Sequence, residues 1–157
     1  MTKLKIKTDV AHHNSCFMKV TMNNTEDHFY GCYKNQQADW FCSIIWAKMA
    51  LMGKMPDRFA PFTGFIEGNI LRKSQFLGNW EFRHVKIDAS GLKSYQNVHS
   101  IPTLNLCLIK ELWTRFEYLN GGNYFVIKCK CNGTKYEYGV PVEYAFAWIR
   151  AFYSLIV

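Results

Sequence analysis

The sequence predicts an α+β fold in which an antiparallel β-sheet packs against about three main helices. Alternating apolar and polar residues predict the strands, apolar residues at helical spacing predict the helices, and Gly, Pro and Asn residues separate them. Of the 157 residues, 49% are hydrophobic and 17% are aromatic, so the chain can bury a large core. We therefore expect residues 1–157 to form a single domain.

Alternation is strictest at the start of the chain. Lys3, Lys5 and Lys7 share one face of a predicted strand, while Leu4 and Ile6 share the other. Lysines in such a row either protect an edge strand from pairing with another chain or contact phosphate groups. Further strands are predicted at 16–22, 28–33 and 80–88.

The strongest hairpin signal is Asn132-Gly133, a dipeptide that favours the type I′ turn. A two-residue loop there joins strands at 124–131 and 134–140 and places Lys128 opposite Glu137. One face of this hairpin carries its cysteines and tyrosines. The other face carries Lys128, Lys130, Lys135 and Glu137.

Three segments have the apolar spacing of helices. The first, 40–52, follows Asp39 as an N-cap and is apolar almost all round. The second begins after Pro102 and ends at Asn120-Gly121-Gly122. Its apolar residues at helical spacing are Leu104, Leu108, Leu112, Phe116 and Leu119. The third follows Pro141.

Two hairpin-and-helix segments resemble each other, because Gly31 precedes Trp40 at the same spacing as Gly139 precedes Trp148. One interpretation is that two ββα units are related by a pseudo-twofold axis. The other is that any two such units look alike. The C-terminal unit also resembles the end of a double-stranded-RNA-binding domain. However, Pro141-Val142-Glu143 stands where that family presents lysines to phosphate, so the resemblance does not imply that family's function.

The formal charge of +7 arises from 19 Lys and Arg against 12 Asp and Glu, spread along the chain. A basic surface favours an acidic partner, such as nucleic acid or an acidic protein. The start of the chain has no signal-peptide pattern, and the apolar run 145–157 is interrupted by Arg150. We therefore expect a cytoplasmic protein with reduced cysteines and no membrane partner.

One group of residues has the order used for nucleophilic catalysis. Cys42 lies in the first turn of a predicted helix, where the helix dipole lowers the pKa of a thiol. Gln36 and Asp39 precede it at spacings that resemble papain-like proteases and ovarian-tumour-type deubiquitinases, respectively. The resemblance implies a cysteine hydrolase in which His84 activates Cys42 and Asp88 orients His84. The alternative is that Cys42 is a buried core residue.

No set of four metal ligands is visible. Cys129 and Cys131 share a strand face, and His12, His13 and Cys16 lie close together in the sequence. A structural zinc site normally needs two pairs of closely spaced ligands, which this sequence lacks. We therefore expect no metal site and no cofactor.

Basic and aromatic residues are interleaved between residues 58 and 86, which is what a groove for single-stranded nucleic acid or RNA needs. They are Arg58, Phe59, Phe62, Phe65, Arg72, Lys73, Arg83 and Lys86. The alternative is a solvated surface over a phenylalanine-lined core. The sequence thus favours a non-enzymatic binding protein that contacts a host protein or nucleic acid, like small viral or phage accessory and inhibitor proteins. The cysteine hydrolase is the second hypothesis.

Overall fold

The computed structural model describes residues 3–7, 15–22, 26–33, 36–51, 53, 63–106, 109 and 111–156. Its strands are β1 (Lys3–Lys7), β2 (Ser15–Met22), β3 (Glu26–Tyr33), β4 (Ile66–Lys73), β5 (Trp80–Asp88), β6 (Gly91–Tyr95), β7 (Leu104–Leu106), β8 (Glu111–Leu119), β9 (Gly122–Cys131) and β10 (Thr134–Pro141). Its helices are α1 (Gln37–Leu51), the 3-10 helix η2 (Val142–Tyr144) and α2 (Ala145–Ser154).

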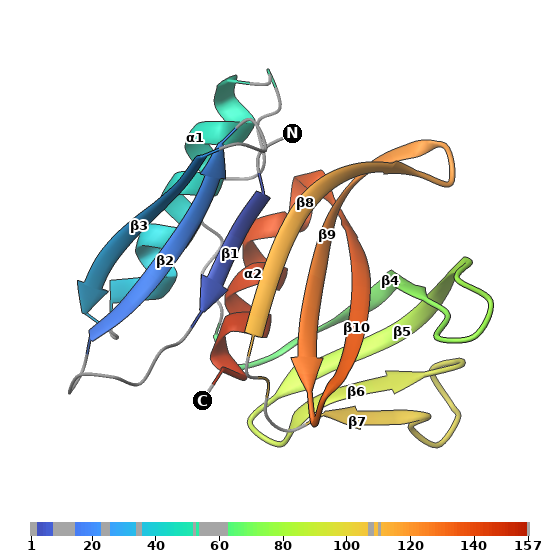
Figure 1. The fold of residues 1–157 in the computed structure, drawn as a ribbon. Helices are drawn as coiled ribbons and strands as arrows, with labels where there is room; N and C mark the ends of the chain where they lie inside the picture. The colour runs from blue at the N-terminus through green and yellow to red at the C-terminus, as the bar shows by residue number, and fades with distance from the viewer. Residues whose placement is uncertain are drawn as a thin grey trace.

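The ten strands form one antiparallel sheet in the order β3-β2-β1-β8-β9-β10-β4-β5-β6-β7. Both α-helices lie on the same side of the sheet, α1 behind β2 and β3 and α2 behind β8 to β10 (Figure 1). In the described part of the chain, no α-helix lies on the opposite side. We call that opposite side the helix-free face. Beyond β10 the sheet turns away from the plane of β8 and β9 (Figure 1).

The prediction of about three main helices was wrong. The described residues contain two α-helices, and the segment expected to form another helix instead contains strands β7 and β8. The apolar residues of that segment recur mostly every four positions, and residues four apart share one side of a strand as well as one side of a helix. The residues of β8, ELWTRFEYL, include several aromatic and β-branched side chains, which favour a strand.

The dipeptide Asn120-Gly121, expected to end that helix, is the turn of a hairpin between β8 and β9. Its residues have φ values of 44° and 82°, close to the 49° and 82° of Asn132 and Gly133. A type I′ turn needs positive φ at both central residues, and Asn and Gly tolerate it. The same dipeptide therefore makes two successive hairpins. The register predicted for the second hairpin, with Lys128 opposite Glu137, is confirmed.

The two predicted ββα units also need correction. Three strands precede each α-helix, in the series β1-β2-β3-α1 and β8-β9-β10-α2. Strands β1 and β8 are neighbours within the sheet, and the remaining strands of each series follow outward in order. The ββα description therefore left out the strand of each series that joins the two halves of the sheet. Strands β4 to β7 extend the sheet beyond β10.

The main core lies between the sheet and α2. From α2 it includes Phe146, Trp148, Ile149 and Phe152, and from the strands it includes Ile70, Val85, Ile127 and Tyr138. A smaller cluster on the helix-free face joins Leu71, Leu119 and Val126 to Trp80 and Tyr124. Gly139 allows this close packing, because a Cβ atom there would lie 3.2 Å from Cβ of Leu71.

Candidate nucleic-acid interface

The alternation of side chains along β9 separates the core from the helix-free face. Ile127 and Cys129 are fully buried under the helices, whereas Lys128 and Lys130 are half-buried. Successive residues of a strand point to opposite sides, so these two lysines lie on the helix-free face. This is the face on which the sequence placed them.

The register of the sheet aligns basic and aromatic positions across five strands. Lys5 of β1 is opposite Trp113 of β8, and Trp113 is opposite Lys128 of β9. Lys128 is opposite Glu137 of β10, which forms an ion pair of 3.2 Å with Lys73 of β4. Residues directly opposite each other in an antiparallel sheet occupy the same face.

A second row runs beside the first. Lys7 is opposite Glu111, Glu111 is opposite Lys130, and Lys130 is opposite Lys135. Only β8 separates β1 from the β9–β10 hairpin in the sheet. The lysines Lys3, Lys5 and Lys7 of β1 therefore lie one strand away from Lys128, Lys130 and Lys135 of the hairpin. The sequence presented these two lysine sets as separate features.

Glu117 and Glu137, two carboxylates of this face, are paired with arginine or lysine. Arg115 donates a 2.7 Å hydrogen bond to Glu137 and a 2.8 Å hydrogen bond to Glu117. Burial raises the pKa of Glu137, but the hydrogen bonds and charges of Arg115 and Lys73 outweigh it and hold that pKa below its ordinary value. No described carboxylate forms an ion pair with Lys128, Lys130 or Lys135.

Acid should weaken the fold through this ion-pair network. A carboxylate with a lowered pKa in the folded chain stabilises it above the unfolded value of 4.5, and the contribution is lost as pH falls through the folded pKa. We expect Glu137→Gln to cost on the order of 1 kcal/mol at neutral pH. It should also flatten the decline in Tm below about pH 4.5. Thermal melts across this pH range test it, with Glu143→Gln as an exposed control. Equal declines in both variants would contradict it.

The predicted cluster between residues 58 and 86 is divided by the sheet. Lys73 and Lys86 lie on the helix-free face, because they alternate with buried Ile70, Val85 and Ile87 along β4 and β5. Arg72 and Arg83 alternate the other way and belong to the side of the helices. Arg58, Phe59 and Phe62 lie outside the described residues.

Several of these cations lie over aromatic rings. Lys73 lies 5.9 Å from the ring centre of Trp80, and Lys86 lies 5.2 Å from that of Phe65. On the side of the helices, Arg72 lies 6.0 Å from the ring of Tyr136. Such contacts hold the cationic groups beside flat apolar surfaces. On the helix-free face this combination suits a ligand that carries both phosphates and bases.

Cys42, His84 and Asp88, the three residues of the hydrolase hypothesis, each contact a different set of residues. Cys42 is fully buried in the main core, and burial raises its pKa to about 11. Nδ1 of His84 lies 3.3 Å from Oδ1 of Asn69, and Nε2 of His84 lies 3.5 Å from Oε2 of Glu67. The ring of His84 packs on that of Tyr95.

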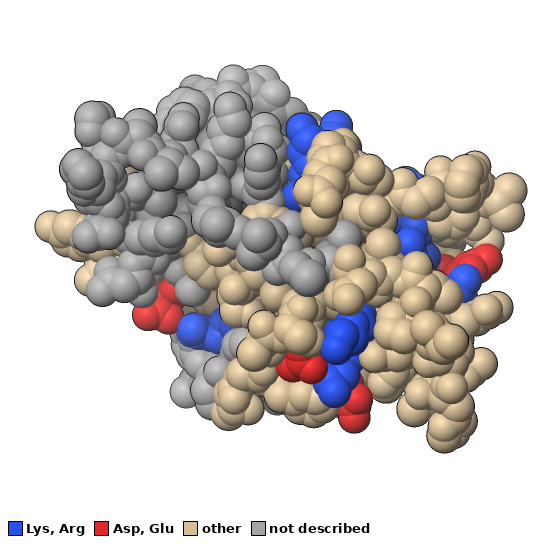
Figure 2. Space-filling model, turned by 90° about the horizontal axis from the view of Figure 1, so that it is seen from below, with Lys and Arg blue, Asp and Glu red and all other residues tan. Residues whose placement is uncertain are grey.

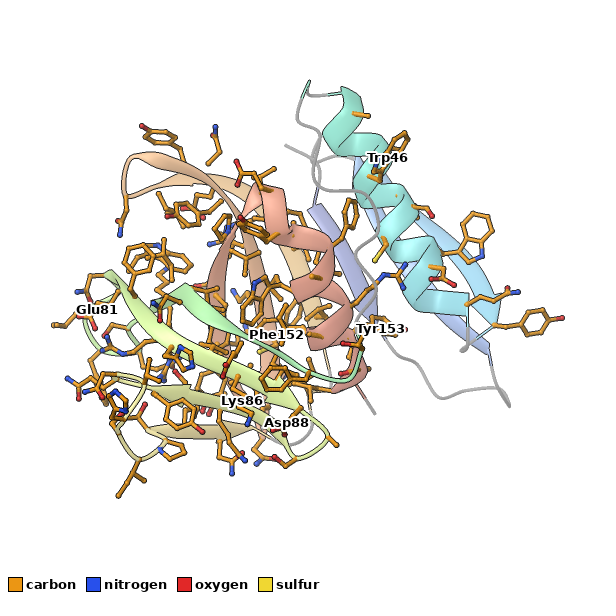
Figure 3. All side chains as sticks on the ribbon, turned by 180° about the vertical axis from the view of Figure 1, so that it is seen from behind. Trp46, Glu81, Lys86, Asp88, Phe152 and Tyr153 are labelled. Atoms are coloured by element: carbon orange, nitrogen blue, oxygen red, sulfur yellow. The ribbon has the colours of Figure 1, made fainter. Side chains whose placement is uncertain are left out.

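Asp88 belongs to a different set of contacts. It accepts hydrogen bonds from the backbone and the hydroxyl of Ser90, and Lys86 lies 3.5 Å away. The hydrogen bonds from Ser90 hold the pKa of Asp88 below its ordinary value. Lys86 and Asp88 lie side by side near the β5–β6 turn (Figure 3). These contacts do not join Asp88 to His84, and a buried neutral thiol at Cys42 is a poor nucleophile.

The described residues contain no group of three or more His, Cys, Asp or Glu side chains that could hold a metal ion. No helix within this part of the chain is both long enough and apolar enough to cross a bilayer. No protein-family model matches the chain, and no curated protein matches it significantly.

Sequence reasoning missed Trp113 and Arg115 as parts of this face. Both lie in the segment that was interpreted as a helix, where they would not share one face with Lys128. Interpreted as a strand, β8 places Trp113, Arg115 and Glu117 on one side by simple alternation. The signal was therefore present in the sequence, but it depended on the correct type of element.

Proposed function

We propose that this chain is a non-enzymatic protein that binds single-stranded nucleic acid across its helix-free face. The observation that carries the proposal is that lysines of β1, β9, β10 and β4 fall on one face of the sheet, in two rows that β8 joins through Trp113 and Glu111. Neighbouring strands lie about 4.8 Å apart, so the basic positions recur at intervals that a flexible phosphate chain can follow. A cation at each phosphate contact releases counterions from the nucleic acid, which favours binding.

The shape of the face supports unpaired rather than paired bases. Reading the bases of duplex DNA requires an element that enters a groove, usually a helix or a two-stranded ribbon. On the helix-free face the cations lie along the strands themselves. Aromatic rings at Phe65 and Phe82 are about half exposed, at 49% and 56%, and rings of this kind stack on unpaired bases. Phe82 lies opposite Leu71, which belongs to the apolar cluster of the helix-free face.

Equilibrium binding to a panel of labelled oligonucleotides tests the proposal. We expect single-stranded RNA and DNA to bind more tightly than a duplex of the same sequence. The logarithm of the affinity should fall with the logarithm of the salt concentration, with a slope of about −0.7 for each phosphate that is neutralised. Absence of binding to every oligonucleotide at about 50 mM salt would contradict the proposal and favour a protein partner. Equal affinity for duplex would contradict the preference for single strands.

A further inference from the structure

Three connections between strands present apolar side chains at one end of the molecule. They are the β4–β5 turn (74–79), the β6–β7 connection (96–103) and the β8–β9 turn (120–121). In both Figure 1 and Figure 3 they lie at the end of the molecule away from α1. We call this region, made of the three connections and Tyr118, the hairpin end.

The apolar side chains of the hairpin end are unusually exposed. Phe76 is 98% exposed and Leu77 is 80% exposed in the β4–β5 turn. Ile101 is 85% exposed in the β6–β7 connection, where Val98 is exposed as well, and Tyr118 is exposed next to the β8–β9 turn. A single exposed apolar residue is common, but a group on adjacent turns marks an interaction surface.

The β4–β5 turn is built to hold Phe76 and Leu77 outward. Ser74 receives a backbone hydrogen bond from Gly78, and its hydroxyl accepts one from the amide of Leu77. The side chain of Gln75 donates a 2.8 Å hydrogen bond to the backbone carbonyl of Lys135, which ties the turn to β10. The two apolar side chains are therefore exposed on an ordered turn.

The β6–β7 connection is ordered in the same way. Asn97 accepts a hydrogen bond from the amide of His99 through its side chain, and Ser100 donates one to the backbone carbonyl of Asn97. The amide of Thr103 donates a 2.7 Å hydrogen bond to Ser94. Val98 and Ile101 thus project from a second fixed turn.

The residues of the hairpin end include no Asp, Glu, Lys or Arg, and the carboxylates beside it are paired. Glu81, which lies at this end in Figure 3, contacts Arg83 and accepts a 3.0 Å hydrogen bond from Asn79. Glu117, near the β8–β9 turn, is paired with Arg115. The right-hand end of Figure 2 accordingly shows mostly uncharged surface. No unpaired carboxylate among these residues would repel an anionic surface.

We propose that the hairpin end docks on the surface of a phospholipid bilayer. Three separate convex turns with apolar tips match a soft planar surface, whereas a protein partner would need three matching hollows. Apolar side chains that enter the boundary between headgroups and acyl chains, together with a net charge of +7, favour an anionic membrane surface. The contact is peripheral and needs no membrane-spanning helix, so it departs from the sequence expectation of no membrane partner. It does not depend on nucleic-acid binding by the helix-free face.

Flotation with lipid vesicles tests the proposal. The wild-type chain should float with phosphatidylcholine vesicles that contain phosphatidylserine and float less with phosphatidylcholine alone. The double substitution Phe76→Ser with Leu77→Ser should lower the partition coefficient at least about tenfold, because both side chains leave the apolar layer. Ile101→Ser, on a different turn, should lower it by a smaller factor. Trp40→Ser is the control, because Trp40 is an exposed aromatic residue of α1, away from the hairpin end.

The outcomes separate the bilayer from other partners. Reduced flotation of both turn variants, with Trp40→Ser floating as the wild type does, supports the proposal. A wild-type chain that does not float with either vesicle overturns it. So does a double variant that floats as well as the wild type, since binding would then depend on charge alone. Circular dichroism of each variant shows that the fold is kept, and Ile101→Ser provides the test if the double variant does not fold.

Discussion

Replacing Tyr138 by alanine is expected to lower the free energy of unfolding by about 3–5 kcal/mol, as for other large aromatic residues removed from a core. Tyr138 is fully buried at the centre of the sheet and packs on Phe152 of α2, with ring centres 5.2 Å apart. Loss of the ring would leave a cavity between β10 and α2. Thermal unfolding should show a decrease in Tm of roughly 10 °C or more.

The conservative substitution at the same position should behave differently. The hydroxyl of Tyr138 is buried, and it has no hydrogen-bond partner among the described residues. A buried hydroxyl without a partner carries an uncompensated loss of hydration, so Tyr138→Phe should be neutral or stabilise the fold by up to about 1 kcal/mol. If Tyr138→Phe destabilises the chain as much as Tyr138→Ala, the hydroxyl has a partner and this description of the core is incorrect.

Local sequence signals predicted the elements whose partners are close in the chain. The hairpin around Asn132-Gly133 was predicted with its register, because two residues with positive φ allow few alternatives. Helix α1 and the final helix were also placed within a few residues. Strand β4 was missed because Gly68 and Asn69 are uncommon in strands. The Cα atom of Gly68 faces α2, since a Cβ atom there would lie 3.4 Å from the ring of Trp148.

The candidate interface could be predicted only in pieces. Lys5 and Lys128 each occupied a segment that was predicted as a strand, whereas Lys73 lies in β4, which was not recognised. What places them together is the pairing of β1 with β8 and of β10 with β4, between segments far apart in the chain. Such pairings depend on the packing of the whole sheet and leave no mark in local alternation. The misinterpretation of β8 as a helix removed the strand that connects the two lysine sets.

Removal of two lysines from the helix-free face should weaken nucleic-acid binding strongly. Lys128 and Lys130 are adjacent on one side of β9 and have no described acidic ion-pair partner. In the double variant Lys128→Gln with Lys130→Gln, two phosphate contacts are lost. We expect affinity for a single strand to fall about 25-fold at 0.1 M salt. Glutamine keeps the strand polar and avoids repulsion with Glu137.

The matched control removes the same charge from the other side of the sheet. Arg72→Gln with Arg83→Gln also lowers the net charge by two, but these residues belong to the side of the helices. If binding depended only on the overall charge of the chain, the two double variants would lose affinity equally. If it depends on the helix-free face, only the lysine variant should lose it. Thermal melts of both variants confirm that each remains folded.

The salt dependence of single-strand affinity, measured for the wild type and these two double variants, tests docking on the helix-free face most directly. Each lysine that contacts a phosphate contributes about 0.7 to the slope of log affinity against log salt. The slope should therefore be shallower by about 1.4 in the lysine variant and unchanged in the arginine variant. Equal slopes for the wild type and the lysine variant would contradict the assignment of this face as the binding surface.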